Sequence, residues 1–373
     1  MSNKINIASI TVSRSDFGRM LPLYLLLQND PDINFTLLIT GSHFNENFSC
    51  TEEIQKAGIN SVLEYPITSL HNPGYVCEEI CRATRQVIQK NDPDYFLILG
   101  DRYEMLSATQ VAVMAKVPVI HIGGGYKTGG AIDDDIRKAI SCLATYHCTA
   151  SSHCSEAVKG LGVEDESIFL TGAPDLDLIK EIPSISYMNF CSKYHLNSDK
   201  KFILCTVHPE TKTNMEIFER NISSLEKFLL SRNEQIIITS PCHDPGHEFI
   251  LDLIKKLQMT SDKIEHIPSL GFEGFIQALH HCSYFIGNSS AGIIEAASIP
   301  TAVINIGTRQ EGRVSAENVL HSDWELKELS ANADKIATKT FQTKLKKTVN
   351  PYGSGECCQM IYELIKNSFK EAV

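Results

Sequence analysis

The chain has 373 residues, a length that predicts two domains rather than one. Its hydrophobic share of 43% and charged share of 21% are those of a globular protein, and its net charge of −11 argues against nucleic acid as a partner, because such binding depends on clustered Lys and Arg. Polar residues interrupt the first apolar stretch before it could form a signal peptide or a membrane span, so we expect a cytoplasmic protein without a membrane partner.

Short apolar runs alternate with amphipathic stretches along the first half of the chain. Strands are predicted in the runs that begin at Ile5, Phe35, Tyr95, Val117 and Tyr146. Helical spacing of apolar side chains is found in residues 16–28, 75–90 and 102–116. Wholly apolar strands that alternate with helices are typical of parallel strands covered on both faces. We therefore expect a doubly wound α/β sheet.

The alternation loosens between residues 180 and 200 and then restarts. Further strands are predicted in residues 201–207, 235–240, 263–268, 283–288 and 301–307, and further helices in 215–230, 246–257 and 272–281. This pattern predicts an N-terminal domain (1–185), a C-terminal domain (186–355) and a final helix (356–373) that could cross back onto the first domain. Two such sheets facing each other leave a cleft at the carboxyl ends of their strands, where open α/β sheets bind ligands.

Neither a metal nor a cofactor is predicted. The 12 cysteines are scattered through apolar segments, as at Cys205 and Cys282, which predicts reduced core thiols rather than disulfides. His243 and His247 are the nearest approach to a metal site, but the chain has no CxxC pair, and polar residues of a loop and first helical turn are the simpler interpretation. The glycine-rich loop after His121 lacks the ordered GxGxxG of a dinucleotide site.

Residues 287–313 combine several features of a phosphate site. A predicted strand ends at Gly287, and the turn that follows carries the hydroxyls of Ser289 and Ser290. If residues 291–297 continue as a helix, a bound diphosphate would meet unpaired N–H groups and the positive end of the helix dipole. Glu295 could accept hydrogen bonds from ribose hydroxyls. Two cations follow the next strand, Arg309 and Arg313. An ordinary capped helix with surface arginines is the alternative.

Two further strand ends carry candidate binding residues. His208 precedes a proline, which favours an extended backbone and would project the ring into the cleft. It could donate to a phosphate oxygen, although a lone histidine is more often structural. Arg14 lies in the first strand-to-helix turn and faces the same edge, and Ser15 or Asp16 can cap the helix that follows.

Asp101 is the leading candidate for acid–base chemistry. It follows a predicted strand, where a carboxylate with few polar neighbours is a plausible general base. The alternative is an N-cap for the helix that begins with Arg102. Farther along, the glycine-rich loop could close over a ligand, and the next helix opens with Asp133 and Asp134.

Taken in order, these segments resemble the UDP-N-acetylglucosamine 2-epimerase family over nearly the whole chain. The matching motifs are TVSRSDFG (11–18), TGSH (40–43), LGDRYEM (99–105), HIGGG (121–125), AIDDDIRKAIS (131–141), HPET (208–211), SLGF (269–272), GNSSAGIIEA (287–296) and NIGTRQEGR (305–313). The resemblance implies two Rossmann-like domains of the GT-B type. Asp101 followed by Arg102 and the HIxGG loop look like the hydrolysing branch, which feeds nonulosonic acid synthesis, whereas the non-hydrolysing branch has GDT and an EAGLRT-like loop.

The resemblance also assigns roles and partners. The substrate would be a UDP-linked 2-acetamido sugar, and the protein would form a homodimer or homotetramer. The catalytic residues would be Asp101, Asp133 and Asp134. The residues that bind the nucleotide sugar would be Arg14, Arg102, His208, Ser289, Ser290, Gly292, Glu295, Arg309 and Arg313. One departure is that the family's loop has acidic residues where this chain has Gly123 and Tyr126.

The reaction implied has two stages. A base removes the C2 proton as UDP leaves C1, and water then adds to the glycal-like intermediate with inversion at C2. The products would be UDP and free N-acetylmannosamine, or its 2,4-diacetamido-6-deoxy counterpart. The alternatives are a non-hydrolysing epimerase, a GT-B glycosyltransferase, and a non-catalytic nucleotide-sugar binding protein, which the missing loop acids would permit. The sequence does not decide whether the nucleotide of the substrate is UDP or GDP.

Overall fold

The computed structural model describes residues 4–44, 51–127, 132–210, 213–241 and 246–367, without the side chains of 51–53. They form two compact units, one of residues 1–126, 132–178 and 352–373 and the other of residues 127–131 and 179–351. The predicted boundaries were 185 and 355, and the units divide at 178 and 351. Among the described residues, no helix is long and apolar enough to span a bilayer.

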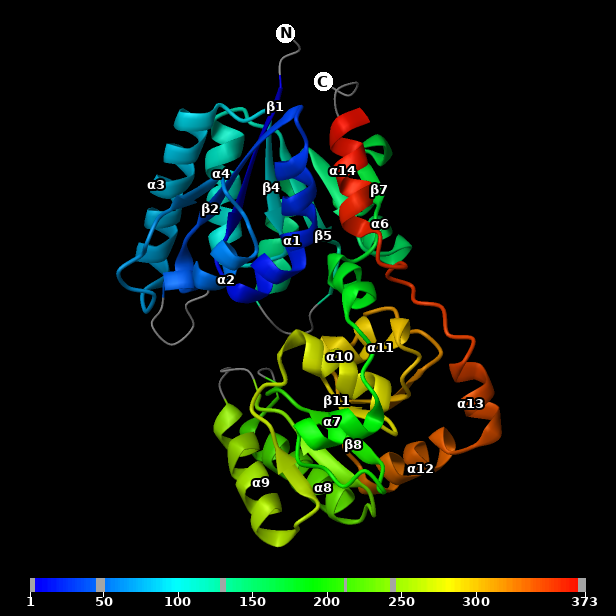
Figure 1. Cartoon of the computed structure of the whole chain (residues 1–373). Coiled ribbons are helices and arrows are strands. Elements are labelled where there is room, and N and C mark those ends of the chain that lie inside the picture. Colours follow the sequence, from blue (N-terminus) through cyan, green and yellow to red (C-terminus); the bar gives the residue numbers. More distant parts are fainter. Residues whose placement is uncertain (1–3, 45–50, 128–131, 211–212, 242–245, 368–373) are drawn as a thin grey trace. The chain divides into compact units, whose positions relative to one another are not determined.

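The first unit is a parallel seven-stranded sheet in the order β3-β2-β1-β4-β5-β6-β7 (Figure 1). Its strands are β1 (Ile5–Thr11), β2 (Ile33–Ile39), β3 (Val62–Glu64), β4 (Tyr95–Leu99), β5 (Val119–Gly124), β6 (Tyr146–Thr149) and β7 (Ile168–Leu170). Its helices are α1 (Arg14–Asn29), α2 (Thr51–Lys56), α3 (Pro73–Asn91), α4 (Tyr103–Met114), α5 (Asp133–Leu143), α6 (Ser152–Lys159) and α14 (Cys357–Asn367).

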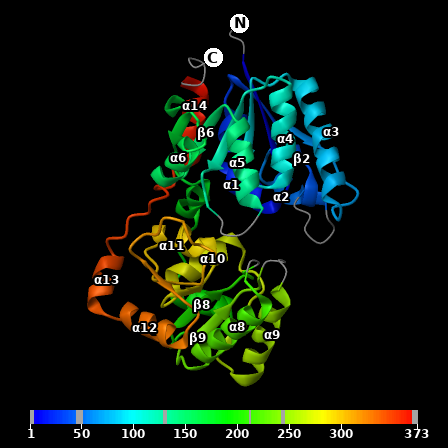
Figure 2. The same cartoon turned by 180° about the vertical axis from the view of Figure 1, so that it is seen from behind.

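Helices cover both faces of this sheet, as Figures 1 and 2 show from opposite sides. On one face α1 and α14 pack in a core that includes Phe17, Leu97 and Ile361. On the other face α3, α4 and α5 pack in a core that includes Ile80 and Phe96. Strands buried on both sides must be apolar throughout, which is why the sequence shows continuous apolar runs rather than alternation.

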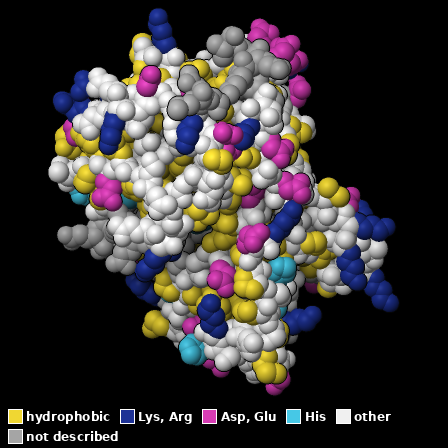
Figure 3. Space-filling model, turned by 45° about the horizontal axis from the view of Figure 1, so that its top comes forward, with side chains coloured by type: hydrophobic (Ala, Val, Ile, Leu, Met, Phe, Trp, Pro, Cys, Tyr) yellow, Lys and Arg dark blue, Asp and Glu magenta, His cyan; other side chains and the backbone are white. Residues whose placement is uncertain are grey.

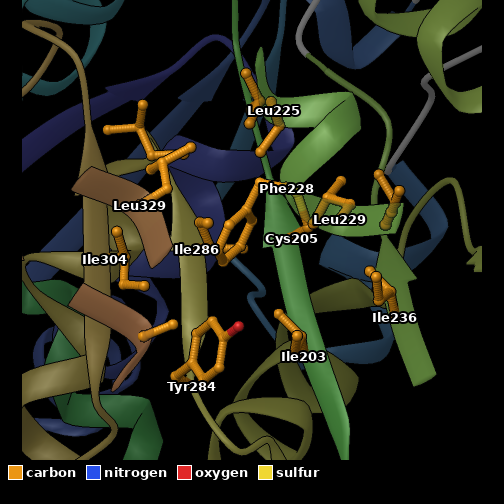
Figure 4. Close-up of a cluster of buried hydrophobic side chains, with 14 of the residues drawn as sticks. Ile203, Cys205, Leu225, Phe228, Leu229, Ile236, Tyr284, Ile286, Ile304 and Leu329 are labelled. Carbon is orange, nitrogen blue, oxygen red and sulfur yellow. The ribbon is translucent and has the colours of Figure 1, made fainter. Parts of the chain in front are cut away.

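The second unit is a parallel six-stranded sheet in the order β10-β9-β8-β11-β12-β13. Its strands are β8 (Phe202–Thr206), β9 (Gln235–Ile238), β10 (Ile264–His266), β11 (Phe285–Gly287), β12 (Val303–Ile306) and β13 (Val319–Ser322). Its helices are α7 (Tyr187–Lys193), α8 (Met215–Leu230), α9 (His247–Thr260), α10 (Gly271–His281), α11 (Glu295–Ser298), α12 (Leu326–Ile336) and α13 (Lys339–Leu345). Figure 4 shows Phe228 of α8 within the core of this unit, among strand residues such as Ile203 and Ile286.

The prediction of two doubly wound α/β sheets is confirmed. The predicted helix over residues 291–297 is wrong, because the structure has a 3₁₀ turn at Ser290–Gly292 and then the four-residue α11. A physical reason is Gly292, which disfavours a helix interior. A Cβ there would meet the Phe285 ring at 2.8 Å, so the tight packing of this turn against β11 requires glycine.

Candidate functional site

Both sheets have a point where the strand order reverses, between β1 and β4 in the first unit and between β8 and β11 in the second. Doubly wound sheets bind their ligands outside the carboxyl ends of the strands at such points. Arg14 and Asp101 follow β1 and β4, and His208 and Ser289 follow β8 and β11. Each unit therefore carries predicted site residues on both sides of its own switch point.

Arg137 joins the acidic residues of the first unit. Its guanidinium, only 4% exposed, pairs with Asp101 and with Asp134, the latter at 2.7 Å from Nη1 to Oδ1. Nη1 also donates to the carbonyl of Tyr126 at 2.6 Å. Asp101 and Asp134 remain 30% and 24% exposed, so a buried cation holds two accessible carboxylates together. Asp133 opens α5 beside them and is half-buried.

Asp101 does not cap a helix. The N-cap of α4 is Arg102, and no side chain makes a capping hydrogen bond there. The alternative interpretation of Asp101 as the cap of α4 is therefore wrong. Asp101 instead forms an ion pair with Arg137 of α5.

His121 of β5 fixes the peptide that precedes Asp101. Its Nε2 lies 2.8 Å from the carbonyl of Gly100, which can only accept, so Nε2 carries the proton. Its Nδ1 lies 3.1 Å from the hydroxyl of Ser141, on the same helix as Arg137. Burial lowers the pKa of His121 to about 4, which keeps the ring neutral at pH 7. One buried histidine thus connects the Asp101 loop to α5.

Arg102 lies beside a second acidic group, which consists of Asp16 and Glu104. Arg14 is exposed as the first residue of α1, which is capped by Ser13 and not by Ser15 or Asp16 as predicted. The cap differs because the helix begins at Arg14, at least two residues earlier than a cap at Ser15 or Asp16 requires. Arg102 donates to Glu104 at 2.8 Å. Burial raises the pKa of Asp16, although Ser13 and Arg102 act in the opposite direction.

Asn288 holds His208 in the second unit. Its side-chain Oδ1 accepts from the backbone N–H of His208 at 2.7 Å, and its Nδ2 donates to the carbonyl of His208 at 2.9 Å. The carbonyl of Asn288 in turn accepts from Gln310 at 2.8 Å and Arg309 at 3.3 Å. The loops after β8, β11 and β12 are therefore joined by hydrogen bonds to one buried residue, Asn288.

The remaining candidates of this unit lie on the same loops. Ser289 accepts from the backbone N–H of Ala291 at 3.4 Å and so caps the 3₁₀ turn that contains Ser290. Glu295 is half-buried at the start of α11. Arg313 donates to the carbonyl of Lys127 at 3.0 Å. α11 has only four residues, so it does not supply the helix dipole that the sequence predicted for a diphosphate site. Backbone N–H groups of the preceding turn could interact with an anion instead.

Glu210 is a further connection between these loops. Its carboxylate accepts from the backbone N–H of Thr308 at 2.8 Å and from the indole of Trp324 at 3.3 Å. The loop that carries Arg309 is thus tied to the loop that carries His208.

No three His, Cys, Asp or Glu side chains gather as a metal site would require, within the residues that the structure describes. Of the two histidines considered above as a metal site, His243 lies outside those residues, and Nδ1 of His247 lies 3.5 Å from Glu248.

On the face drawn in Figure 3, Lys and Arg are interspersed with Asp and Glu.

The sequence model of the family described as UDP-N-acetylglucosamine 2-epimerase matches residues 26–366. The chain belongs to this family. It is 31% identical over 366 residues to a Legionella pneumophila protein named UDP-N,N'-diacetylbacillosamine 2-epimerase (hydrolyzing), with 96% of this chain and 94% of the relative covered. It is also 31% identical over 327 residues to a UDP-N-acetylglucosamine 2-epimerase of Neisseria meningitidis, with 87% and 85% covered.

Solved structures support the fold. A crystal structure of UDP-GlcNAc 2-epimerase from Neisseria meningitidis bound to UDP-GlcNAc aligns with a TM-score of 0.81 at 19% identity, covering 97% of this chain and 100% of the other. The GT-B-like architecture that the resemblance implied is confirmed.

Sequence reasoning did not assign a role to several residues that organise the site of this family member. They are Arg137, His121, Asn288, Gln310 and Glu210. All five lie within recognised motifs, which was the available signal. Apart from Asp134 and Tyr126, which lie near Arg137 in the sequence, their partners lie at least 20 positions away along the chain, and no local spacing indicates such pairs.

Proposed function

We propose that this chain is a hydrolysing 2-epimerase, which converts UDP-N-acetylglucosamine, or the 2,4-diacetamido-6-deoxy equivalent, to UDP and a free manno-configured sugar. The observation that carries the proposal is Asp101 at the switch point of the first sheet, joined through Arg137 to Asp134. A similar Legionella pneumophila protein is named as hydrolysing, which favours this branch.

The first unit would carry the sugar chemistry. Asp101 would remove the proton from C2 while the bond from C1 to the UDP oxygen breaks, and the intermediate would then contain a C1–C2 double bond. Water would supply a hydroxyl to C1 and a proton to the opposite face of C2. Arg137 holds Asp101 and Asp134 side by side, so Asp134, with Asp133 next to it, is the second candidate for proton transfer.

The second unit would bind the nucleotide. The hydroxyls of Ser289 and Ser290, the N–H groups of their turn and the ring of His208 would stabilise the negative charge that develops on the departing diphosphate. Gly292 lets this turn pack closely on β11. Glu295 would bind the ribose, and Arg309 and Arg313 would add positive charge.

Incubation with a panel of nucleotide sugars, followed by NMR of the products, tests the proposal. UDP-linked and GDP-linked sugars that differ at C4 and C6 would identify the substrate. Free nucleotide and free manno-configured sugar should appear in equal amounts. No turnover of any sugar, together with tight UDP binding, would instead favour a non-catalytic nucleotide-sugar binding protein.

A non-hydrolysing epimerase is the second candidate. It is favoured by the equal identity, 31%, to the Neisseria meningitidis protein, whose name does not include hydrolysis. In that case the inverted sugar would still be attached to UDP in the same NMR experiment.

A further inference from the structure

Asn288 makes both hydrogen bonds of one backbone residue that lies 80 positions away. Its amide accepts from the N–H and donates to the carbonyl of His208, and the whole residue is inaccessible to solvent. His208 lies beyond the end of β8, so the sheet no longer pairs these two groups. The direction of the His208 backbone is therefore set by one side chain rather than by a strand.

The surroundings of Asn288 are built to hold it in place. A Cβ on Gly287 would lie 1.8 Å from the carbonyl oxygen of Thr206, so only glycine allows β11 to end this close to β8. The N–H of Asn288 donates to that same carbonyl at 3.2 Å. Gln310, which is 2% exposed, donates to the carbonyl of Asn288 at 2.8 Å. Buried polar groups with all these partners are costly to disrupt.

We infer that Asn288 is a positioning residue for nucleotide binding, which acts through His208. Its side chain is buried and cannot contact a ligand, but it fixes the backbone that aims the His208 ring. A preorganised donor binds an anion more tightly than one that must be ordered on binding. The inference rests on the proposed function, because it takes His208 as a ligand of the diphosphate.

Calorimetric titration with UDP in a double-mutant cycle tests this role. Asn288→Ala should weaken UDP binding by about tenfold or more, since the backbone that aims the ring of His208 is no longer held. In a His208→Ala background, the same change should alter UDP affinity by less than about twofold, because residues that act as a unit are not additive. A purely structural role would give equal losses in both backgrounds.

Asn318 provides a matched control. It is an equally buried asparagine of the same sheet, and its amide donates to the carbonyl of Thr301 at 2.8 Å, before the start of β12. Asn318→Ala should lower the unfolding temperature but leave UDP affinity within about twofold of wild type. If Asn288→Ala does not fold, Asn288→Ser replaces it in the double-mutant cycle with His208→Ala, because serine keeps a polar group at this position and adds no charge.

The outcomes separate the inference from the proposed function. Wild-type protein that fails to bind UDP would contradict the proposed function itself. Two results would overturn the role of Asn288 while wild type binds UDP normally. One is a UDP affinity that is unchanged in His208→Ala or in Asn288→Ala. The other is a pair of losses that add in the double variant.

Discussion

Asp101 is the residue whose replacement should separate chemistry from binding. Asp101→Asn keeps the size of the side chain and some hydrogen bonding to Arg137 but removes the basic carboxylate. A positioned base contributes about 10²- to 10⁴-fold to the rate, so turnover should fall by at least that factor. UDP affinity, measured by calorimetry, should stay unchanged because the proposed ligands of the diphosphate and the ribose lie in the second unit.

Asp134→Asn is the comparison for this experiment, because the same arginine holds both acids. Near-normal turnover of Asp101→Asn would move the base to Asp133 or Asp134.

Gly123 stands where the resemblance described above implies an acidic residue, and its backbone conformation disfavours any residue with a Cβ. Its φ is +82°, a conformation that costs residues with a Cβ about 1 to 2 kcal/mol. An added Cβ would lie 3.7 Å from the Tyr126 ring, which leaves room for a side chain. Gly123→Glu should therefore lower stability without raising turnover.

Gly123→Ala is the control, since it adds the strain without the carboxylate. Thermal unfolding should show equal losses for both variants. A Gly123→Glu enzyme that is faster than both wild type and Gly123→Ala would mean that the natural enzyme works without a useful acid.

At the residue scale, strand ends and motifs were enough to predict Asp101, His208 and Ser289 as candidates. The partners that fix them were not predictable. Arg137 pairs with Asp101 across 36 positions, and Asn288 reaches His208 across 80. Such pairs depend on which strands become neighbours, and a single sequence contains no spacing that records this.

Long helices with strong periodicity such as α8 were predicted well, and several short strands were not. The helix over residues 215–230 matches α8, whereas β3, β7 and β13 have only three or four residues and were missed. β10 and β11 also have three residues, but they were predicted because they lie within the longer runs 263–268 and 283–288. The helix expected after Ser290 failed for a different reason, because the packing of Gly292 on Phe285 outweighs local propensity.

Helix α14 is held in the first unit by two carboxylates. Asp177 accepts from the first backbone N–H groups of the helix, those of Cys357 at 3.0 Å and Cys358 at 2.6 Å. Asp30 accepts from Tyr362 at 2.5 Å and Lys366 at 2.6 Å near its other end. Hydrogen bonds to charged groups contribute about 1.5 to 3 kcal/mol each. The final helix therefore depends on Asp30 and Asp177.

Asp30→Asn should lower the unfolding temperature by several degrees, measured by calorimetry. Burial alone would raise the pKa of Asp30, but hydrogen bonds from Lys366 and Tyr362 outweigh it and lower the pKa to about 2. The stabilisation is thus complete above about pH 4 and is lost as the pH falls toward 2, so wild type and variant should converge there.

The control for Asp30→Asn is Asp165→Asn, which breaks an exposed ion pair with Lys159. It should have little effect on the unfolding temperature. Equal effects of the two variants would contradict a special role of Asp30.

At the scale of the whole molecule, acid should unfold the first unit before the second. Burial lowers the pKa of three of its histidines, His43, His121 and His147, to about 4, whereas it lowers the pKa of His266, His280 and His321 in the second unit by less. Because these rings take up protons near pH 6.5 only when unfolded, stability is complete above that pH and falls between pH 6.5 and 4. Each contributes a slope of up to about 1.4 kcal/mol per pH unit.

Hydrogen exchange with mass spectrometry at pH 7, 5.5 and 4.5 would follow the two units separately. Protection in β1, β4 and β5 should fall at a higher pH than protection in β8 and β11. His147→Gln, which removes one of the three rings, should reduce the acid sensitivity of the first unit. Loss of protection in the second unit first would contradict this prediction.

The central claim is that the C2 proton is removed and that water supplies its replacement. The most direct measurement is the reaction of the identified UDP-sugar in deuterated water, followed by NMR and mass spectrometry. We expect free manno-configured sugar that carries one deuteron at C2, in an amount equal to the UDP released. Free sugar with its original hydrogen at C2, or deuterated sugar that remains attached to UDP, would contradict this claim.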